Sequence, residues 1–275
     1  MMSLLLEYPF FRRALVVGAC LALCAALLGV NLVLGRYSMI GDGLSHTAFG
    51  ALAVAAAMGV APLYVALPVT MLAAILLLRL GKKSGDTAVA LLSVSALAVG
   101  VLVLSVRGMN TDVNSYLFGS LLALTGQDVL LCAVLTVLVL GLYFVFYHRL
   151  FAVSFDAPFA QAAGQKTGLT GAVLAVLTAA VVVLGMRLMG ALLISALILF
   201  PALSAMRVFG SYRFVTIGSA VLALVAFAAG LFASWVLNLP TGASIVVANL
   251  LVFLLCVVGV RIFAAVRKQK KQEIG

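Results

Sequence analysis

The chain has 275 residues, of which 66% are hydrophobic and 9% are charged, and its formal net charge is +10. A soluble domain is about half apolar and about a quarter charged, so this composition excludes a soluble fold and predicts an integral membrane protein. The apolar runs are continuous rather than alternating, which favours helices over a barrel. Basic residues are typical of cytoplasmic loops, and we expect no nucleic-acid binding because no soluble basic face exists.

A helix that crosses a bilayer needs about 20 apolar residues. The stretches that meet this requirement are 14–34, 39–59, 63–80, 87–106, 128–147, 168–186, 189–206, 214–236 and 243–265. The stretch 189–206 follows its predecessor after almost no loop and contains Pro201, so it either spans the membrane or is re-entrant. The sequence therefore predicts an all-α polytopic bundle of about 8–9 transmembrane helices, forming one domain over residues 1–275.

The basic residues predict which ends of these helices face the cytoplasm. If every stretch crosses and the C-terminus is cytoplasmic, most of the 17 lysines and arginines lie inside, as the positive-inside tendency requires. The exceptions on the outside are Arg12, Arg13, Arg107 and Arg187. The tail 267–275 is expected to be a solvated cytoplasmic end with secondary contact to anionic lipid. Leu4–Leu6 is too short for the apolar core of a cleavable signal peptide.

Cysteines appear within the first predicted helix. Cys20 and Cys24 are four residues apart and share a helix face, so they could form part of a thiolate metal site. We interpret them instead as small apolar filler, because every cysteine of the chain lies in an apolar run.

The second predicted helix carries two ionisable side chains. Asp42 and His46 are four residues apart, which places them on one helix face together with Met39. Such side chains in a membrane usually line a pathway or meet a partner. A carboxylate and an imidazole at this spacing can bind one divalent cation, although two ligands do not complete a coordination shell. The alternative is an ion pair or hydrogen bond that only packs helices.

Small residues surround this pair and predict a close approach of another backbone. They are Gly41, Gly43, Ser45, Gly50 and Ala51. Such residues are typical of packed helix interfaces or of a narrow conduit.

A short polar segment, 154–166, separates two later spans. Asp156 suits a helix N-cap, Pro158 suits the first turn, and Gly164 suits the C-terminal stop. Phe159 and Ala163, with Ala160 between them, give a short apolar face. On the predicted topology this segment is cytoplasmic. It could dock into a groove on another protein or pack on its own bundle, and the residues alone leave both open.

At these residues the chain resembles a known family, the permease subunits of zinc/manganese ABC importers. The matching segments, in order, are FFRRALVVGACLALCAALLGVNLVLGRYSMIGDGLSH with its GD-xx-[SA]H core, VNSYLFGSLLAL, SFDAPFAQAAG, RLMGALLISALILFPALSA and PTGASIVVANLLVF. The resemblance covers nearly the whole chain and implies a type II ABC importer-like helical bundle in the prokaryotic plasma (inner) membrane.

The resemblance also implies partners and roles. Two permease copies would form a homodimer around a pathway, cytoplasmic ATPase subunits would dock on 154–166, and an extracellular or periplasmic metal-binding protein would deliver the ion. Asp42 and His46 occupy the core positions that are thought to contact metal in the family. Some zinc-importing relatives carry a histidine where this chain has Val94, a departure that weakens the choice of metal.

The sequence-based hypothesis is an importer permease for a divalent transition metal, with zinc first and manganese or ferrous iron as alternatives. No cofactor is bound permanently. The chain has no GxxxxGK[ST] motif, so ATP hydrolysis is assigned to a separate subunit and this chain is not an enzyme. The rival hypotheses are a proton- or sodium-coupled secondary transporter that uses Asp42 and His46 as a relay, and a structural subunit without a pathway.

Overall fold

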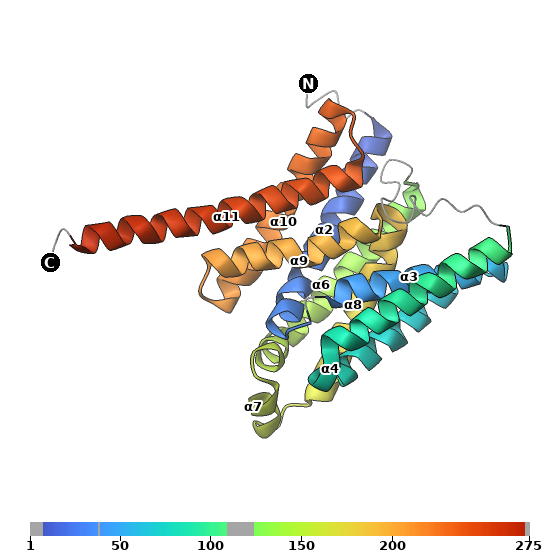
Figure 1. Cartoon of the computed structure of the whole chain (residues 1–275), viewed down its shortest axis with the longest axis horizontal. Coiled ribbons are helices and arrows are strands. Elements are labelled where there is room, and N and C mark those ends of the chain that lie inside the picture. The colour runs from blue at the N-terminus through green and yellow to red at the C-terminus, as the bar shows by residue number, and fades with distance from the viewer. Residues whose placement is uncertain (1–7, 38, 109–123, 273–275) are drawn as a thin grey trace.

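The computed structural model describes residues 8–37, 39–108 and 124–272, and it describes side chains throughout these ranges except at 80–86 and 263–272. The helices are α2 (Pro9–Leu34), α3 (Ile40–Ala57), α4 (Pro62–Val106), α6 (Gly126–Phe155), α7 (Ala157–Ala162), α8 (Thr167–Met189), α9 (Ala191–Val208), α10 (Tyr212–Leu237) and α11 (Thr241–Gln272). No strand occurs within these ranges, so the predicted all-α fold is confirmed (Figure 1).

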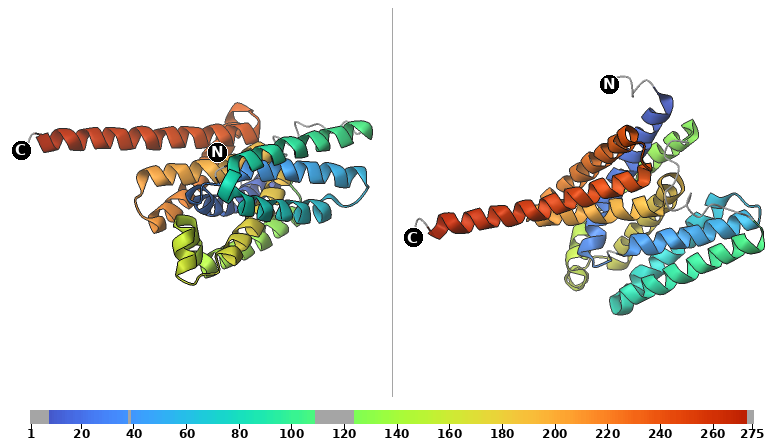
Figure 2. Two further views of the ribbon diagram at one scale, coloured as in Figure 1. Left: turned by 60° about the horizontal axis from the view of Figure 1, so that its bottom comes forward. Right: turned by 45° about the horizontal axis from the view of Figure 1, so that its top comes forward.

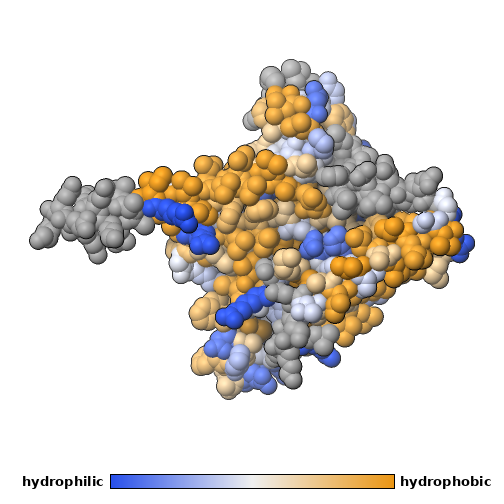
Figure 3. Space-filling model, in the orientation of Figure 1, coloured by the Kyte–Doolittle hydropathy of each residue, from blue (hydrophilic) through white to orange (hydrophobic). Residues whose placement is uncertain are grey.

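Eight segments of the described helices are long and apolar enough to cross a membrane. They match the predicted stretches except 39–59, which forms α3 but is not among the eight. α3 carries Asp42 and His46 and is therefore more polar than its neighbours. Most of its side chains are buried against other helices, which explains how it can lie within an otherwise apolar bundle. The apolar outer surface of the bundle is formed by other helices, and Figure 3 shows apolar side chains over α11 and α4.

α4 is helical over all of its 45 residues and contains two of the eight spans, Pro62–Arg79 and Thr87–Val106, which match the predicted stretches 63–80 and 87–106. A straight helix of this length would measure about 68 Å, more than twice the hydrocarbon core. Its contacts show that it folds back. In the first half of α4, the Leu78 carbonyl accepts a hydrogen bond from Tyr37, which lies just before the start of α3. In the second half, Val89 lies against Gly43 near the start of α3, and Ala96 lies against Gly50 farther along α3. The two halves therefore run in opposite directions beside α3 (Figure 2).

Long-range contacts define two ends of the bundle. Asn31, near the end of α2, accepts hydrogen bonds from Ser154 and Tyr212, so the end of α6 and the start of α10 lie with it. We call this the α7 end, because α7 follows Ser154 directly. At the opposite end Arg13 donates to the Leu124 carbonyl, and Arg187 pairs with Asp128.

α9 connects these two ends, which decides between the alternatives for the stretch 189–206. It begins directly after α8 at the opposite end and finishes just before Tyr212 at the α7 end. Its 18 residues span about 27 Å, close to the thickness of a bilayer core. Pro201 lies inside this continuous helix and is buried. The segment is therefore a full-length helix and not a re-entrant one.

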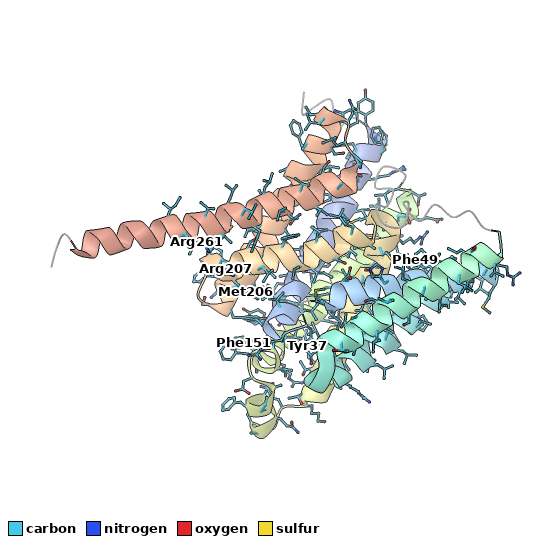
Figure 4. The ribbon with its side chains drawn as sticks, viewed as in Figure 1. Tyr37, Phe49, Phe151, Met206, Arg207 and Arg261 are labelled. Carbon is cyan, nitrogen blue, oxygen red and sulfur yellow. The ribbon has the colours of Figure 1, made fainter. Side chains whose placement is uncertain are left out.

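The basic residues separate between the two ends as predicted. The α7 end holds Arg36, Arg149, Lys166 and Arg213, which lie at or beside the ends of α2, α6, α8 and α10, and Figure 4 shows Arg207 where α9 finishes. Arg13 and Arg187 lie at the opposite end, where Trp235 packs against the rings of Tyr8, Phe10 and Phe11. An aromatic cluster of this kind is typical of a membrane interface. The separation supports the predicted topology with the α7 end in the cytoplasm.

The C-terminal helix is longer than predicted. α11 continues to Gln272, beyond the predicted end of the last span at 265, so residues 267–272 of the expected tail are helical. Residues 273–275 lie outside the described part of the chain.

Candidate functional site

Asp42 and His46 lie on one face of α3, as their spacing predicts. The His46 Nε2 and Asp42 Oδ1 atoms are 3.6 Å apart, and the side chains are 21% and 50% exposed. This distance is longer than a hydrogen bond. The carboxylate and the imidazole therefore do not hydrogen-bond to each other, and the ligand atoms of both side chains can reach a third atom.

The pair opens into a cavity of about 530 Å³ between α3 and the second half of α4. The lining residues are Met39, Asp42, His46, Val89, Ala90, Ser93, Val94 and Leu97. Met39 shares the face with the pair, as predicted. Apart from Asp42 and His46, the lining is apolar except for Ser93, whose hydroxyl donates to the Val89 carbonyl of its own helix. The strongest metal ligands of the cavity are therefore the carboxylate and the imidazole.

Glycines bring the two walls of this cavity together. A Cβ atom at Gly43 would lie 2.7 Å from Val89 Cγ1, and one at Gly50 would lie 2.5 Å from the Ala96 carbonyl oxygen. Such distances leave no room for a side chain, so the backbones of α3 and α4 are in direct contact. The predicted close approach at the small residues is confirmed, and it fixes Asp42 and His46 opposite α4.

The described residues contain no group of three or more His, Cys, Asp and Glu side chains that could hold a metal ion. Cys20 and Cys24, the alternative thiolate pair, are free cysteines in α2. Asp42 and His46 are thus the carboxylate and the imidazole that the described residues place at this cavity.

The predicted capping of the segment 154–166 is confirmed. The Asp156 Oδ1 atom accepts a hydrogen bond of 2.9 Å from the Phe159 amide and caps α7. Pro158 lies in the first turn, where its missing N–H costs no helical hydrogen bond. The helix ends at Ala162 with Ala163 as its C-cap, and Gly164 follows with φ of 79°, which favours glycine.

The short helix presents one side to the bundle and another to solvent. Ala160 is buried, whereas Phe159 is 71% exposed and Phe155, at the end of α6, is 73% exposed. Ala160 thus packs on the bundle instead of contributing to an outward apolar face. Two exposed phenylalanines at the α7 end form a surface that a groove on another protein could cover.

Polar residues that the sequence analysis did not single out form a second cluster at the α7 end. Asn31 is fully buried in α2 and contacts Tyr143, Ser154 and Tyr212. An asparagine inside an apolar span is the signal that could have found it.

Arg187, which was predicted to lie outside, pairs with an acidic side chain: its Nη2 atom lies 3.9 Å from Asp128 Oδ1. Asp128 lies in the first turn of α6 and forms a capping box with Thr125. Residues 113–123, which make up most of the matching segment VNSYLFGSLLAL, lie outside the described residues.

Known proteins resemble this chain over nearly its whole length. The "Probable metal transport system membrane protein" of Thermotoga maritima is 33% identical, covering 91% of this chain and 90% of the relative. The manganese import system permease protein ScaB of Streptococcus gordonii is 30% identical, covering 90% of each. A chain of PsaBC from Streptococcus pneumoniae, solved in complex with a Fab, is 28% identical with a TM-score of 0.82, covering 93% of this chain and 95% of that one.

A model of the ABC 3 transport family matches residues 7–259, which include α3, α7 and the cavity. The matched range, the shared fold and the relatives agree on one class of protein. The chain therefore belongs to the ABC 3 transport family and is a metal ABC transporter permease, a non-enzymatic, multi-pass protein of the plasma membrane.

Proposed function

We propose that this permease imports a divalent transition metal and that Asp42 and His46 contact the ion transiently during transport. The observation that carries this proposal is that the two side chains face a cavity with apolar walls, with 3.6 Å between their nearest ligand atoms. Ionisable groups in such surroundings are expensive unless they serve a pathway. The position of the pair at the GD-xx-[SA]H core supports the same role.

The coordination shell is completed by a second copy of the chain. One copy offers a carboxylate and an imidazole, and a homodimer with the two cavities facing each other would offer two of each. Four ligands suffice for a tetrahedral ion, and added water completes a six-coordinate one.

Manganese is the first candidate for the ion, in place of the zinc favoured by the sequence alone. ScaB, which is 30% identical, is a manganese import system permease by name. The cavity adds a physical argument, since Val94 lines it where some zinc-importing relatives carry a histidine. Without that imidazole the ligand set is richer in oxygen, which suits manganese. Zinc and ferrous iron remain alternatives.

Separate ATPase subunits drive the transport by docking at α7 from the cytoplasm. Asp156, Pro158, Ala163 and Gly164 shape the helix, and Phe159 supplies the exposed apolar contact. An external metal-binding protein delivers the ion at the opposite end of the bundle.

Metal uptake in depleted cells tests the metal site. Asp42→Ala and His46→Ala should abolish uptake of one metal, measured separately with manganese, zinc and ferrous iron at matched membrane expression. Each variant removes half of the ligands that one copy supplies. His148→Ala is the matched control, because it replaces the other of the two histidines, which lies on α6 outside the cavity.

Normal uptake by Asp42→Ala and His46→Ala would show that the pair only packs helices. Uptake that survives removal of the ATPase but stops when the proton or sodium gradient collapses would favour the secondary transporter.

A further inference from the structure

Asn31 uses its whole hydrogen-bonding capacity inside the bundle. Its Nδ2 atom donates to the Leu27 carbonyl at 3.2 Å and to the Tyr143 hydroxyl at 3.3 Å. Its Oδ1 atom accepts from the Tyr212 hydroxyl at 3.0 Å and from Ser154 Oγ at 3.2 Å. An amide has two donor hydrogens and two acceptor lone pairs, so no capacity is left over.

Three of these groups close a ring of hydrogen bonds. The Tyr143 and Tyr212 hydroxyls are 3.1 Å apart. Tyr212 donates its single proton to Asn31, so Tyr143 must be the donor to Tyr212. The bonds then run in one direction, from Asn31 to Tyr143, to Tyr212 and back to Asn31. Each bond polarises the next, and a complete ring fixes the relative positions of α2, α6 and α10.

The ring is attached to α7. Ser154, which donates to Asn31, lies two residues before Asp156, the N-cap of α7. The Phe151 ring lies 4.7 Å from the Tyr212 ring and 5.8 Å from the Phe155 ring, measured between centroids. Figure 4 shows Phe151 at the α7 end of the bundle. Movement of α7 therefore acts on the hydrogen-bonded ring through the Ser154 hydrogen bond and through the packed aromatic side chains of Phe155 and Phe151.

The ring is also connected to the metal cavity. Gly29, two residues before Asn31, is so close to α9 that a side chain there would collide with the Ile198 carbonyl. The same Ile198 reaches α3, since a Cβ atom at Gly41 would lie 3.1 Å from Ile198 Cδ1. Gly41 directly precedes Asp42. With backbone against backbone at Gly29, displacement of α2 has to move α9, and α9 bears on the start of α3.

We propose that the ring of Asn31, Tyr143 and Tyr212 couples α7 to the metal cavity, so that these three are positioning residues for transport. The inference rests on the proposed function. Hydrogen bonds suit this task because they are directional and either form or break.

The amount of manganese transported per ATP hydrolysed tests the role of this hydrogen-bonded ring. The permease is purified with its ATPase subunit and reconstituted in vesicles, and manganese uptake and ATP hydrolysis are measured together. Tyr212→Phe removes one hydroxyl from the ring and keeps the aromatic packing. We expect hydrolysis to persist while the manganese transported per ATP falls about fivefold or more, the size of a typical coupling between sites.

Tyr147→Phe is the matched control. Tyr147 lies on α6, and its ring is 5.2 Å from the Tyr212 ring, but its hydroxyl is not part of the hydrogen-bonded ring. This variant should transport as much manganese per ATP as the wild type. Tyr143→Phe, which breaks the ring at a second point, should reproduce the effect of Tyr212→Phe.

Two results would overturn the inference. The first is that Tyr212→Phe transports as much manganese per ATP as the wild type. The second is an equal loss of uptake and hydrolysis together with a lower Tm, which would show that the ring only stabilises the fold. Asp42→Ala in the same vesicles separates the two proposals. If it transports normally, the proposed function fails and the coupling role fails with it. If it is inactive while Tyr212→Phe stays coupled, only the ring is rejected.

Discussion

The carboxylates of Asp128 and Asp42 differ in the number of donors that they face. The Asp128 Oδ2 atom accepts hydrogen bonds from the Thr125 amide and hydroxyl, and Oδ1 faces Arg187. Among the described residues Asp42 has no comparable donors, and His46 lies 3.6 Å away. The first carboxylate is satisfied and stabilises the start of α6. The second has free coordination capacity at a cavity, which is what binding of a passing cation requires.

Asp156 acts at the residue scale by holding α7 in shape. Asp156→Ala removes the N-cap bond to Phe159, and losing such a cap costs about 0.5–2 kcal/mol. A helix of six residues cannot absorb this loss, so we expect α7 to fray and less ATPase to copurify with the permease.

Asp156→Asn, which keeps a cap, should retain the wild-type yield of the complex. An unchanged yield for Asp156→Ala would mean that the shape of α7 does not determine docking.

At the scale of elements, glycines set the distance between α3 and α4. Gly50→Ala would place a methyl group 2.5 Å from the Ala96 carbonyl oxygen, so the helices must separate. Overpacking of this kind costs about 1–3 kcal/mol. We expect a lower Tm and impaired uptake, because the cavity lies between these same helices.

Gly141→Ala is the control for Gly50→Ala. It adds the same methyl group to a helical glycine in α6 with no atom within 4 Å of the new Cβ. A Tm for Gly50→Ala equal to that of Gly141→Ala would show that the α3–α4 contact is not tight.

At the scale of the whole molecule, the two ends should face different compartments. Basic residues gather at the α7 end, so that end should be cytoplasmic. A cysteine introduced at Gln161, on α7, should therefore resist an impermeant thiol reagent in intact cells and react after lysis. A cysteine introduced at Arg107, after α4, should react in both.

Labelling is measured relative to the unmodified chain, whose free cysteines are buried or partly buried. The reverse pattern of labelling would invert the topology and place α7 away from any cytoplasmic ATPase.

Local periodicity explains which features the sequence determined. Apolar runs of membrane length predicted the helices, because in lipid the backbone must satisfy its own hydrogen bonds. The spacing of four placed Asp42 and His46 on one face, and the order Asp156, Pro158, Gly164 predicted the limits of α7. These features depend on residues within a turn or two of one another. The predicted single-domain organisation stays a prediction.

Tertiary structure decided what depends on distant residues. The fold-back of α4 brings Val94 to the cavity of Asp42, and packing of α2 against α6 and α10 closes the ring at Asn31. The partners of Asn31 in this ring are 112 and 181 residues away. Periodicity shows which face of a helix is apolar or polar, but not which helix covers it. That choice follows from side-chain shape and glycine contacts across the whole bundle, so only the assembled fold could reveal it.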